Sequence, residues 1–405
     1  MNKQWFIGID VAGAGIHFQV QNPHGELFGE DKVSKDLDGF ERFLRLCEQW
    51  GVLWDRALVI VEATGRHHLP WCERLVAQGT DVYALNPLLT KRLYSSRNAI
   101  RDNKDDRLDA HSLAEIGRIH RGELERFAYR RQSDKIGLQS LIGARKEVRK
   151  QCTNLLKSAG DLLDLVFPEA KKLGLRLTQD GFRRLLLRNT TPAEIARMRE
   201  SDLDHALGKK ADKLLEAARA SFTPTEVSSA CKPALRALIE TIETLLRQLA
   251  LLDQTIAETF SQREHARNKQ AEKLIRSIPG FGEKTAAVIA AFLPEGFEQW
   301  GNKKKITAKL QAFYGCDPRR RESGTFKGKV KLSKRGIEIV RTSLFQASFC
   351  SIMHDPLLRA YYDKKKAEGD HHKKAIFDLV RKNLRRIVAV LVDQKEFQIR
   401  HEKTA

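Results

Sequence analysis

The sequence lacks the usual features of a membrane, secreted or zinc-binding protein. Its six cysteines are scattered, with no C-x-x-C pair and no paired histidine spacing, so neither a zinc site nor a disulfide framework is indicated. The N-terminus has no signal peptide, and no apolar run is long enough to span a bilayer. We therefore expect a soluble protein of the reducing cytoplasm that has no membrane partner.

Acidic residues are few compared with basic ones. The chain has 72 Lys and Arg against 52 Asp and Glu, which gives a formal charge of +20. Residues 301–336 alone contain twelve Lys or Arg and two acidic residues, a net charge of +10. This excess is larger than an ordinary metabolic enzyme requires and favours a polyanionic partner over a merely soluble basic surface.

Four carboxylates in the first third of the chain have positions typical of a metal site. Asp10 and Glu62 each end an apolar run that predicts a buried strand, so both would lie at the rim of a sheet. Asp106 and Asp109 are three residues apart, the spacing that puts two side chains on one face of a helix. Gathered carboxylates favour Mg²⁺ or Mn²⁺ and phosphodiester chemistry. Ordinary solvent-exposed carboxylates are the alternative.

The N-terminal region predicts an α/β domain. Three short antiparallel strands over residues 5–30 precede a helix at 36–50, a strand at 57–62, a helix at 68–78 and a strand at 81–85. A further helix then carries the Asp106 pair. This order of elements is the one expected of a ribonuclease H-like fold.

Helical patterns dominate residues 133–275. Within them, apolar residues recur at spacings of four and three, the period of a coiled-coil seam: Leu238, Ile242, Leu245, Leu249, Leu252 and Ile256. Three heptads fit an intermolecular coiled coil and one helix of an intramolecular bundle equally well. Residues 160–232 predict a further helical insert, interrupted near Pro168 and Pro224, in which no chemistry is evident.

Residues 274–290 predict a helix-hairpin-helix. A Pro-Gly-x-Gly turn with Gly280 and Gly282 separates two helical segments, and Lys284 and Thr285 lie in the first turn of the second. The glycines would let the backbone approach a phosphate, which the helix N-terminus would attract. Such contacts position a duplex without reading its sequence. A tight structural turn is the alternative.

A basic, glycine-rich loop follows the hairpin. Ser323 lies among arginines and lysines that would stabilise charge on phosphate oxygens, so it is a candidate nucleophile. From the residues alone, however, Ser-Gly in a basic loop is more often a turn, and Ser333 predicts a helix cap or a phosphate contact. The cations expected to bind nucleic acid here are Arg319, Arg320, Arg321, Lys327, Lys334 and Arg335.

Seven motifs together resemble those of the DEDD-type insertion-sequence transposases, a family described as bridge-RNA-guided recombinases. They are Ile7-Gly8-Ile9-Asp10, Glu62-Ala63-Thr64-Gly65, Asn86-Pro87, Lys104-x-Asp106-x-x-Asp109-Ala110 with Leu113-Ala114, Ile278-Pro279-Gly280-x-Gly282, Pro318-Arg319-Arg320-x-Glu322-Ser323-Gly324 and Ser333-Lys334-x-Gly336. The resemblance implies a RuvC-like domain at 1–130, a helical linker with insert and coiled coil at 131–270, and a mainly α-helical transposase domain with the hairpin and a catalytic serine at 271–405.

The resemblance also implies roles for these residues. Asp10, Glu62, Asp106 and Asp109 would hold Mg²⁺ or Mn²⁺, and Ser323 would attack the scissile phosphate to form a phosphoserine link to DNA. A covalent ester conserves the energy of the phosphodiester, so strands can be rejoined without ATP. The implied partners are double-stranded donor and target DNA, a structured guide RNA and further copies of the chain in a dimer or tetramer. The expected location is the prokaryotic cytoplasm, in association with the nucleoid during activity.

One motif departs from the family, which usually has Lys-Thr-Asp where this chain has Lys104-Asp105-Asp106. Asp102 and Asp105 therefore form a rival pair at a spacing of three. Asp106 and Asp109 are preferred because the residues after Asp109 match the family register, although Asp105 would still be near the metal.

Other functions fit parts of the pattern. A RuvC-like nuclease would hydrolyse DNA without a covalent intermediate, with Ser323 merely structural. A nucleic-acid-binding scaffold would keep an idle metal site. An actin-like ATPase also begins with a Gly-Ile-Asp strand, but no second glycine-rich phosphate motif is present in this chain.

Overall fold

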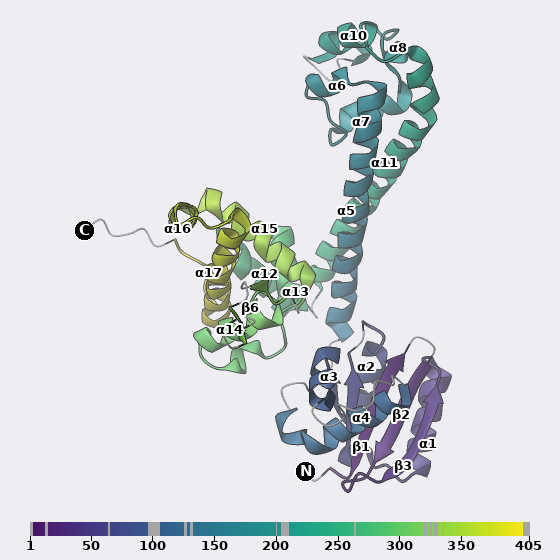
Figure 1. The fold of residues 1–405 in the computed structure, drawn as a ribbon, viewed down its shortest axis with the longest axis vertical. Helices are drawn as coiled ribbons and strands as arrows, with labels where there is room; N and C mark the ends of the chain where they lie inside the picture. Colours follow the sequence, from purple (N-terminus) through teal and green to yellow (C-terminus); the bar gives the residue numbers. More distant parts are fainter. Residues whose placement is uncertain are drawn as a thin grey trace, which may run out of the picture. The chain divides into compact units, whose positions relative to one another are not determined.

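The computed structural model describes most of the chain, in two compact units that divide after Ser133: Met1–Ser133 and Asp134–Ala405 (Figure 1). The described residues are 3–12, 15–63, 65–95, 106–124, 128–129, 133–199, 201–203, 210–262, 265–319, 322–323, 326–327, 331–334 and 336–399. Each unit has its own hydrophobic core.

The first unit contains a mixed five-stranded sheet. Its strands are β1 (Trp5–Ala12), β2 (Gly15–Gln21), β3 (Leu27–Val33), β4 (Ala57–Glu62) and β5 (Asp81–Leu85), in the spatial order β3-β2-β1-β4-β5. β2 is antiparallel to β1 and β3, whereas β4 is parallel to β1 and β5. The three antiparallel strands and the two later strands were predicted from the sequence. A mixed sheet followed by a mostly helical chain is compatible with a ribonuclease H-like start.

Helices cover both faces of this sheet. Helices α1 (Leu37–Gln49) and α2 (Leu69–Ala77) pack on the face formed by Ile7, Ile9 and Val11 and their neighbours. Helix α4 (Asp106–Ile119) packs on the opposite face, with α3 (Pro87–Ser95) beside it. Two short 3₁₀ turns, Trp54–Arg56 and Arg121–Glu123, complete the unit. Strand β4 has apolar side chains buried on both faces, as its continuous apolar sequence predicts.

Helix α4 lies very close to strand β1 because small residues meet at the contact. A Cβ atom added to Gly8 would overlap the carbonyl oxygen of Ala110 and the amide nitrogen of Ala114. Further along α4, a Cβ added to Gly117 would be 2.8 Å from the Ile60 side chain on β4. The backbone of α4 therefore runs directly over β1 and β4, at a distance that only glycine permits.

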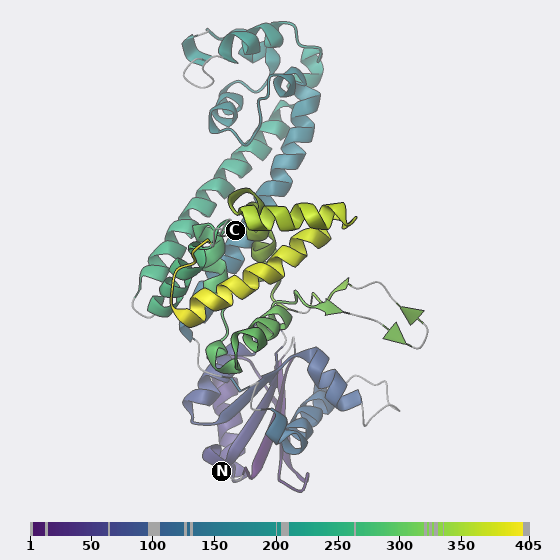
Figure 2. The ribbon, with the colours of Figure 1, turned by 90° about the vertical axis from the view of Figure 1, so that its left-hand side faces the viewer.

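The second unit contains two long helices. Helix α5 (Ser133–Val166) and helix α11 (Thr225–Ser261) lie side by side in Figures 1 and 2, and the helical insert occupies the end where the chain turns back. The insert contains α6 (Glu169–Lys172), α7 (Asp180–Arg188), α8 (Pro192–Ile195) and α10 (Ala211–Arg219). Arg183, 5% exposed, joins it to α11 through an ion pair with Glu243 at 2.5 Å.

The apolar seam of α11 is buried within the chain. Ile242 and Leu249 share one core with Ala159 and Leu163 of α5. Ile256 belongs to a second core, formed mainly by the helices that follow α11. Leu238 and Leu245 are only partly buried against the same partners. Of the two alternatives that the heptad pattern left open, the intramolecular helix pair accounts for this burial.

The rest of the second unit is mainly helical. It comprises α12 (Ala266–Arg276), α13 (Glu283–Ala291), the 3₁₀ turn Phe297–Trp300, α14 (Lys303–Phe313), four two-residue strands β6 (Pro318–Arg319), β7 (Glu322–Ser323), β8 (Phe326–Lys327) and β9 (Lys331–Leu332), and α15 (Glu338–His354), α16 (Pro356–Ala367) and α17 (His372–Asp393). Helices α12 to α15 and α17 share one core with the adjoining ends of α5 and α11. Across the described parts of both units, no helix is sufficiently long and apolar to cross a membrane.

Gly8→Ala is expected to lower the free energy of unfolding of the first unit by about 1–3 kcal/mol, because the added methyl group would push α4 away from β1. The measurement is urea unfolding of the full chain followed by tryptophan fluorescence. Gly137→Ala is the control: this glycine of α5 has open space around its Cβ position, so the change should stabilise the helix by up to about 1 kcal/mol. Equal effects of the two substitutions would contradict the close packing at Gly8.

Candidate active site

Asp10 and Glu62 lie at the ends of neighbouring parallel strands. In the register of β1 with β4, Ile9 is opposite Val61, so the next residue on each strand brings Asp10 beside Glu62. Directly paired residues of parallel strands project to the same face of the sheet, here the face covered by α4. Asp10 is only 7% exposed. A buried carboxylate beside a second carboxylate needs hydrogen bonds or a cation to remain ionised.

Helix α4 carries Asp109 to the same end of the sheet. Asp109 precedes Leu113 by four residues and Ile116 by seven, so it lies on the stripe of α4 that packs against β1 and β4. Ala110 packs over Gly8, two residues before Asp10, so the N-terminal end of α4 is next to the carboxyl ends of β1 and β4. Asp106 is the first residue of α4, and its side chain lies outside the described residues.

A polar network that we did not predict holds α4 on the sheet. The Nδ1 atom of His111 on α4 is 2.7 Å from Gln19 Oε1 and 3.0 Å from Gln21 Nε2, both on β2. Gln19 in turn donates to Glu30 on β3, which also pairs with Arg107 of α4. Residues 107 and 111 are four apart and share a face of the helix, so these bonds fix its rotation. The sequence contained no signal for this network beyond isolated polar residues in strands.

Thr90 of α3 supports one of the site carboxylates. Its hydroxyl donates a hydrogen bond to Glu62 Oε1 at 2.7 Å, and the Pro87 carbonyl oxygen lies 2.9 Å from the same hydroxyl. Thr90 is buried, so the bond is protected from water. Helix α3 begins at Pro87 of the Asn-Pro pair, and its Thr90 orients Glu62.

His17 is a second residue at the site that sequence reasoning missed. It is directly opposite Asp10 in the antiparallel pair β1 and β2, and cross-strand partners project to the same face. It also lines a cavity of about 240 Å³ together with Glu30, Lys32 and Arg107. The register between β1 and β2 decides which residue faces Asp10, and local sequence does not reveal it.

The donor set suits a hard divalent cation. Asp10, Glu62 and Asp109 would offer carboxylate oxygens, the ligands that hard divalent cations prefer. Among the described side chains, no three His, Cys, Asp or Glu residues are already gathered as a metal site. The geometry brings two carboxylates and the N-terminal turn of α4 to one sheet edge.

Ser323 lies in the second unit, in a loop made of two small antiparallel ladders. β6 pairs with β9 and β7 with β8, where Ser323 is opposite Phe326 (small green arrows in Figure 2). The side chains of Ser323, Arg319 and Lys327 lie outside the described residues, as do Asp102, Asp105, Arg320, Arg321 and Arg335. The loop is thus described by its backbone ladder alone.

The base of this loop is closed by local bonds. The Ser333 hydroxyl donates to the Asp317 carboxylate, and the Ser333 amide donates to the Asp317 carbonyl at 2.9 Å. Gly336 packs so closely on Phe313 and Tyr314 that a Cβ atom would overlap their backbone. Ser333 therefore does not cap a helix, since α15 begins five residues later at Glu338. Lys334 is exposed, with a left-handed backbone φ of 54°.

The predicted hairpin consists of α12, a turn and α13. Gly280 has a φ of +88°, and a Cβ on it would be 2.5 Å from the amide nitrogen of Ser351 on α15. The Ser351 hydroxyl also donates to the Pro279 carbonyl at 2.7 Å. Gly280 thus faces a neighbouring helix, whereas Gly282 is exposed at the start of α13. Thr285 follows within the first turn of α13.

Comparison with known families gives two matches in this chain. Residues 7–168 match the DEDD transposase family of IS110 elements, described as "Transposase". Residues 272–363 match "Transposase IS116/IS110/IS902 family". The first match contains Asp10, Glu62 and Asp109, and the second contains the hairpin and the loop with Ser323. Together the sheet edge and these matches define a DNA transposase of the DEDD class.

The chain belongs to the IS116/IS110/IS902 family of insertion-element transposases. It is 25% identical over 407 residues to the "Insertion element IS116 uncharacterized 44.8 kDa protein" of Streptomyces clavuligerus, covering 97% of this chain and 96% of that protein. It is 24% identical to the "Insertion element IS110 uncharacterized 43.6 kDa protein" of Streptomyces coelicolor, covering 98% and 96%. A match to an IS900 protein of Mycobacterium paratuberculosis, 28% identical, covers 38% of this chain and 37% of that protein. Membership implies dependence on a divalent metal ion in general.

Thr90→Val is expected to raise the Mg²⁺ concentration needed for half-maximal DNA strand transfer by about ten-fold, because Glu62 loses the hydroxyl that orients it. A Mg²⁺ titration of strand transfer, started from EDTA-treated protein, measures this. Thr241→Val is the control, because its hydroxyl bonds only to its own helix at the Ala237 carbonyl. An unchanged Mg²⁺ requirement in a stably folded Thr90 variant would show that Glu62 does not depend on this bond.

Proposed function

We propose that this transposase cleaves and rejoins DNA through a covalent link to Ser323, with a Mg²⁺ or Mn²⁺ ion at the sheet edge and a structured guide RNA that selects the DNA. The observation that carries the proposal is the placement of Asp10 beside Glu62 under the N-terminal turn of α4. The family match over the loop with Ser323 supports the second half of the chemistry.

The carboxylates would hold the metal in this reaction. Asp10 and Glu62 would be its ligands from the sheet, with Asp109 and Asp106 supplying oxygens from α4. Such an ion neutralises charge on the scissile phosphate and polarises its oxygens. Thr90 orients Glu62 through its hydrogen bond, and the closeness of α4 to Gly8 holds the first turn of this helix at the same edge.

Ser323 would act as the nucleophile. Its Oγ forms a bond to phosphorus, the bond from phosphorus to the deoxyribose oxygen of the leaving strand breaks, and the serine proton ends on that oxygen. Rejoining is the reverse reaction with a different strand hydroxyl, so the number of phosphodiester bonds is conserved. The loop sequence contains no histidine to serve as base, which is why metal-assisted deprotonation is proposed.

The partners follow from charge and from the family. Double-stranded donor and target DNA would contact the basic stretch 301–336 and the exposed start of α13 at Gly282. The proposed guide RNA would select both DNAs by base pairing. We further propose that the chain acts as a dimer or tetramer in which one copy's carboxylates serve another copy's Ser323.

Ser323→Ala is expected to abolish covalent protein–DNA adducts and to reduce strand transfer by at least about 10³-fold, because no hydroxyl remains to attack. The measurement is denaturing electrophoresis of end-labelled DNA after reaction. Ser140→Ala, at an exposed position of α5, is the matched control and should behave like the wild type. Normal cleavage by the Ser323 variant would favour the hydrolytic RuvC-like nuclease.

Asp10→Asn in the same assay tests the carboxylate half of the proposed chemistry. The variant should retain DNA binding and lose both adduct formation and strand transfer, because the amide cannot replace a buried carboxylate ligand. Unchanged recombination would place catalysis elsewhere and leave the sheet edge as part of a binding scaffold.

RNA purified with the protein is expected to contain one dominant structured species encoded by the same insertion element. Sequencing of this RNA tests the guided mechanism. Segments of this RNA should be complementary to the donor and the target DNA, and altering the target-complementary segment should redirect insertion to the matching site. Equal recombination after thorough ribonuclease treatment and removal of RNA would overturn the guided mechanism and leave the transposase activity standing.

A further inference from the structure

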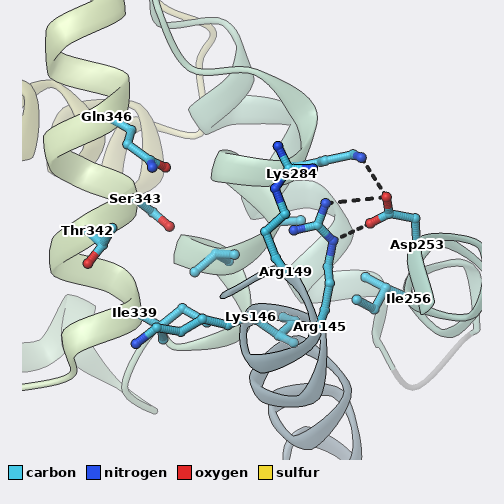
Figure 3. A pocket seen from close by; sticks show the side chains of 13 residues that line it. Arg145, Lys146, Arg149, Asp253, Ile256, Lys284, Ile339, Thr342, Ser343 and Gln346 are labelled. Carbon is cyan, nitrogen blue, oxygen red and sulfur yellow. Dashed lines mark hydrogen bonds and ion pairs between the residues drawn. The ribbon is translucent and has the colours of Figure 1, made fainter. Parts of the chain in front are cut away.

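A cavity in the second unit is lined by four cations and has no role in the mechanism above. It has a volume of about 190 Å³ and lies between helices α5, α11, α13 and α15 (Figure 3). Its charged lining is Arg145, Lys146 and Arg149 from α5, Lys284 from α13 and Asp253 from α11. These helices share one hydrophobic core, so the cavity belongs to a single packed body.

One carboxylate holds two of the cations. Asp253 pairs with Arg145, and Lys284 Nζ is 2.5 Å from Asp253 Oδ2, as the dashed lines of Figure 3 show. Burial alone would raise the pKa of Asp253, but the hydrogen bonds from Arg145 and Lys284 outweigh this and lower it, so the carboxylate stays charged. Lys284, predicted to bind nucleic acid at the hairpin, lines the cavity and pairs there with Asp253.

The other two cations exceed the acidic groups that face them. Lys146 pairs with Glu338 at 3.0 Å, where both side chains are substantially exposed. Arg149 is exposed, and its guanidinium has no hydrogen bond or ion pair within the described part of the chain. The lining therefore has a positive excess, which disfavours a metal cation and favours an anion.

The opposite wall provides neutral polar groups. Thr342, Ser343 and Gln346 project from α15 across the cavity from Asp253 (Figure 3). Ser343 is buried, whereas Thr342 and Gln346 are exposed at the rim. Hydroxyl and amide donors together with guanidinium groups match the tetrahedral oxygens of a phosphate, and arginine binds them with two parallel hydrogen bonds.

We propose that this cavity binds a backbone phosphodiester group of nucleic acid, with Arg149 as its principal ligand and Thr342 and Gln346 as supporting donors. The phosphate competes with Asp253 for Arg145 and Lys284, whose charges then face the ligand. This proposal rests on the proposed function in one respect, which is that the partner is a nucleic acid. Phosphate contacts of this kind position a strand and do not read its sequence.

The test is the binding of 5′-labelled duplex DNA and duplex RNA of equal sequence, measured by fluorescence anisotropy in EDTA. Arg149→Ala should weaken binding about ten-fold and lower the slope of log affinity against log salt by about one, because one phosphate contact is lost. Lys157→Ala is the control. This exposed lysine of the same helix does not line the cavity, so its loss should change affinity less than about two-fold.

The two nucleic acids distinguish the source of the phosphate. If Arg149→Ala weakens the binding of DNA only, the cavity binds the DNA backbone. If it weakens the binding of RNA only, the cavity binds the RNA backbone. Equal losses in the Arg149 and Lys157 variants, or none in either, would overturn the proposal. The binding assay contains EDTA, so no strand is cut and its outcome does not depend on Ser323. If Arg149→Ala leaves binding unchanged, the proposed role of Ser323 still stands. If Ser323 is not the nucleophile, the difference in binding between the Arg149 and Lys157 variants is still expected.

Asp253→Asn gives a result of opposite sign. Removal of the carboxylate frees Arg145 and Lys284, so binding should tighten several-fold and depend more steeply on salt. The thermal unfolding midpoint of the variant shows whether the helices remain packed. Weaker binding at an unchanged midpoint would overturn the proposed competition between Asp253 and phosphate.

Discussion

The contact between strand β1 and helix α4 is the constraint on which the candidate active site depends. Gly8 has no side chain, and the backbone of α4 occupies the space that a Cβ atom would need. Asp10 follows two residues later on the same face, and Asp109 precedes Ala110 at the contact. Hence a single close approach brings carboxylates from a strand and a helix to one edge, even though about a hundred residues separate them.

Some cations of this basic protein form internal ion pairs, and others remain unpaired among the described residues. Around the sheet, Arg107 and Glu30 neutralise each other and anchor α4. In the cavity of the second unit, Asp253 pairs with two cations while Arg149 stays unpaired among the described residues. Internal ion pairs thus build the scaffold, and the remaining positive charge is available for a polyanion. The overall charge of +20 counts paired and unpaired cations together, so it does not show which of them are available to a polyanion.

Much of the fold was predictable from local patterns. The apolar runs ending at Asp10 and Glu62 are strands, because buried parallel strands are apolar on both faces. The seam of α11 is a buried helix stripe, but periodicity did not reveal whether its partner was α5 or another chain. For the hairpin glycines the sequence predicts phosphate contacts or a tight structural turn, and the structure shows that Gly280 is needed for close packing on α15. For Ser333 the sequence predicts a helix cap or a phosphate contact; the structure excludes the cap, because the Ser333 hydroxyl bonds to Asp317 at the base of the loop that contains Ser323.

The sequence by itself determined the family, the strand-end carboxylates and the excess of positive charge, because these depend on residue identity, order and short-range periodicity. Only the tertiary structure decided that His17 faces Asp10, that Thr90 orients Glu62 and that His111 joins Gln19 beneath α4. Only the tertiary structure also assembled the cavity around Arg149, from four helices distant in sequence. The physical reason is that strand register, helix rotation and ion-pair choice are set by packing between segments, and no local stretch of sequence contains both sides of such a contact.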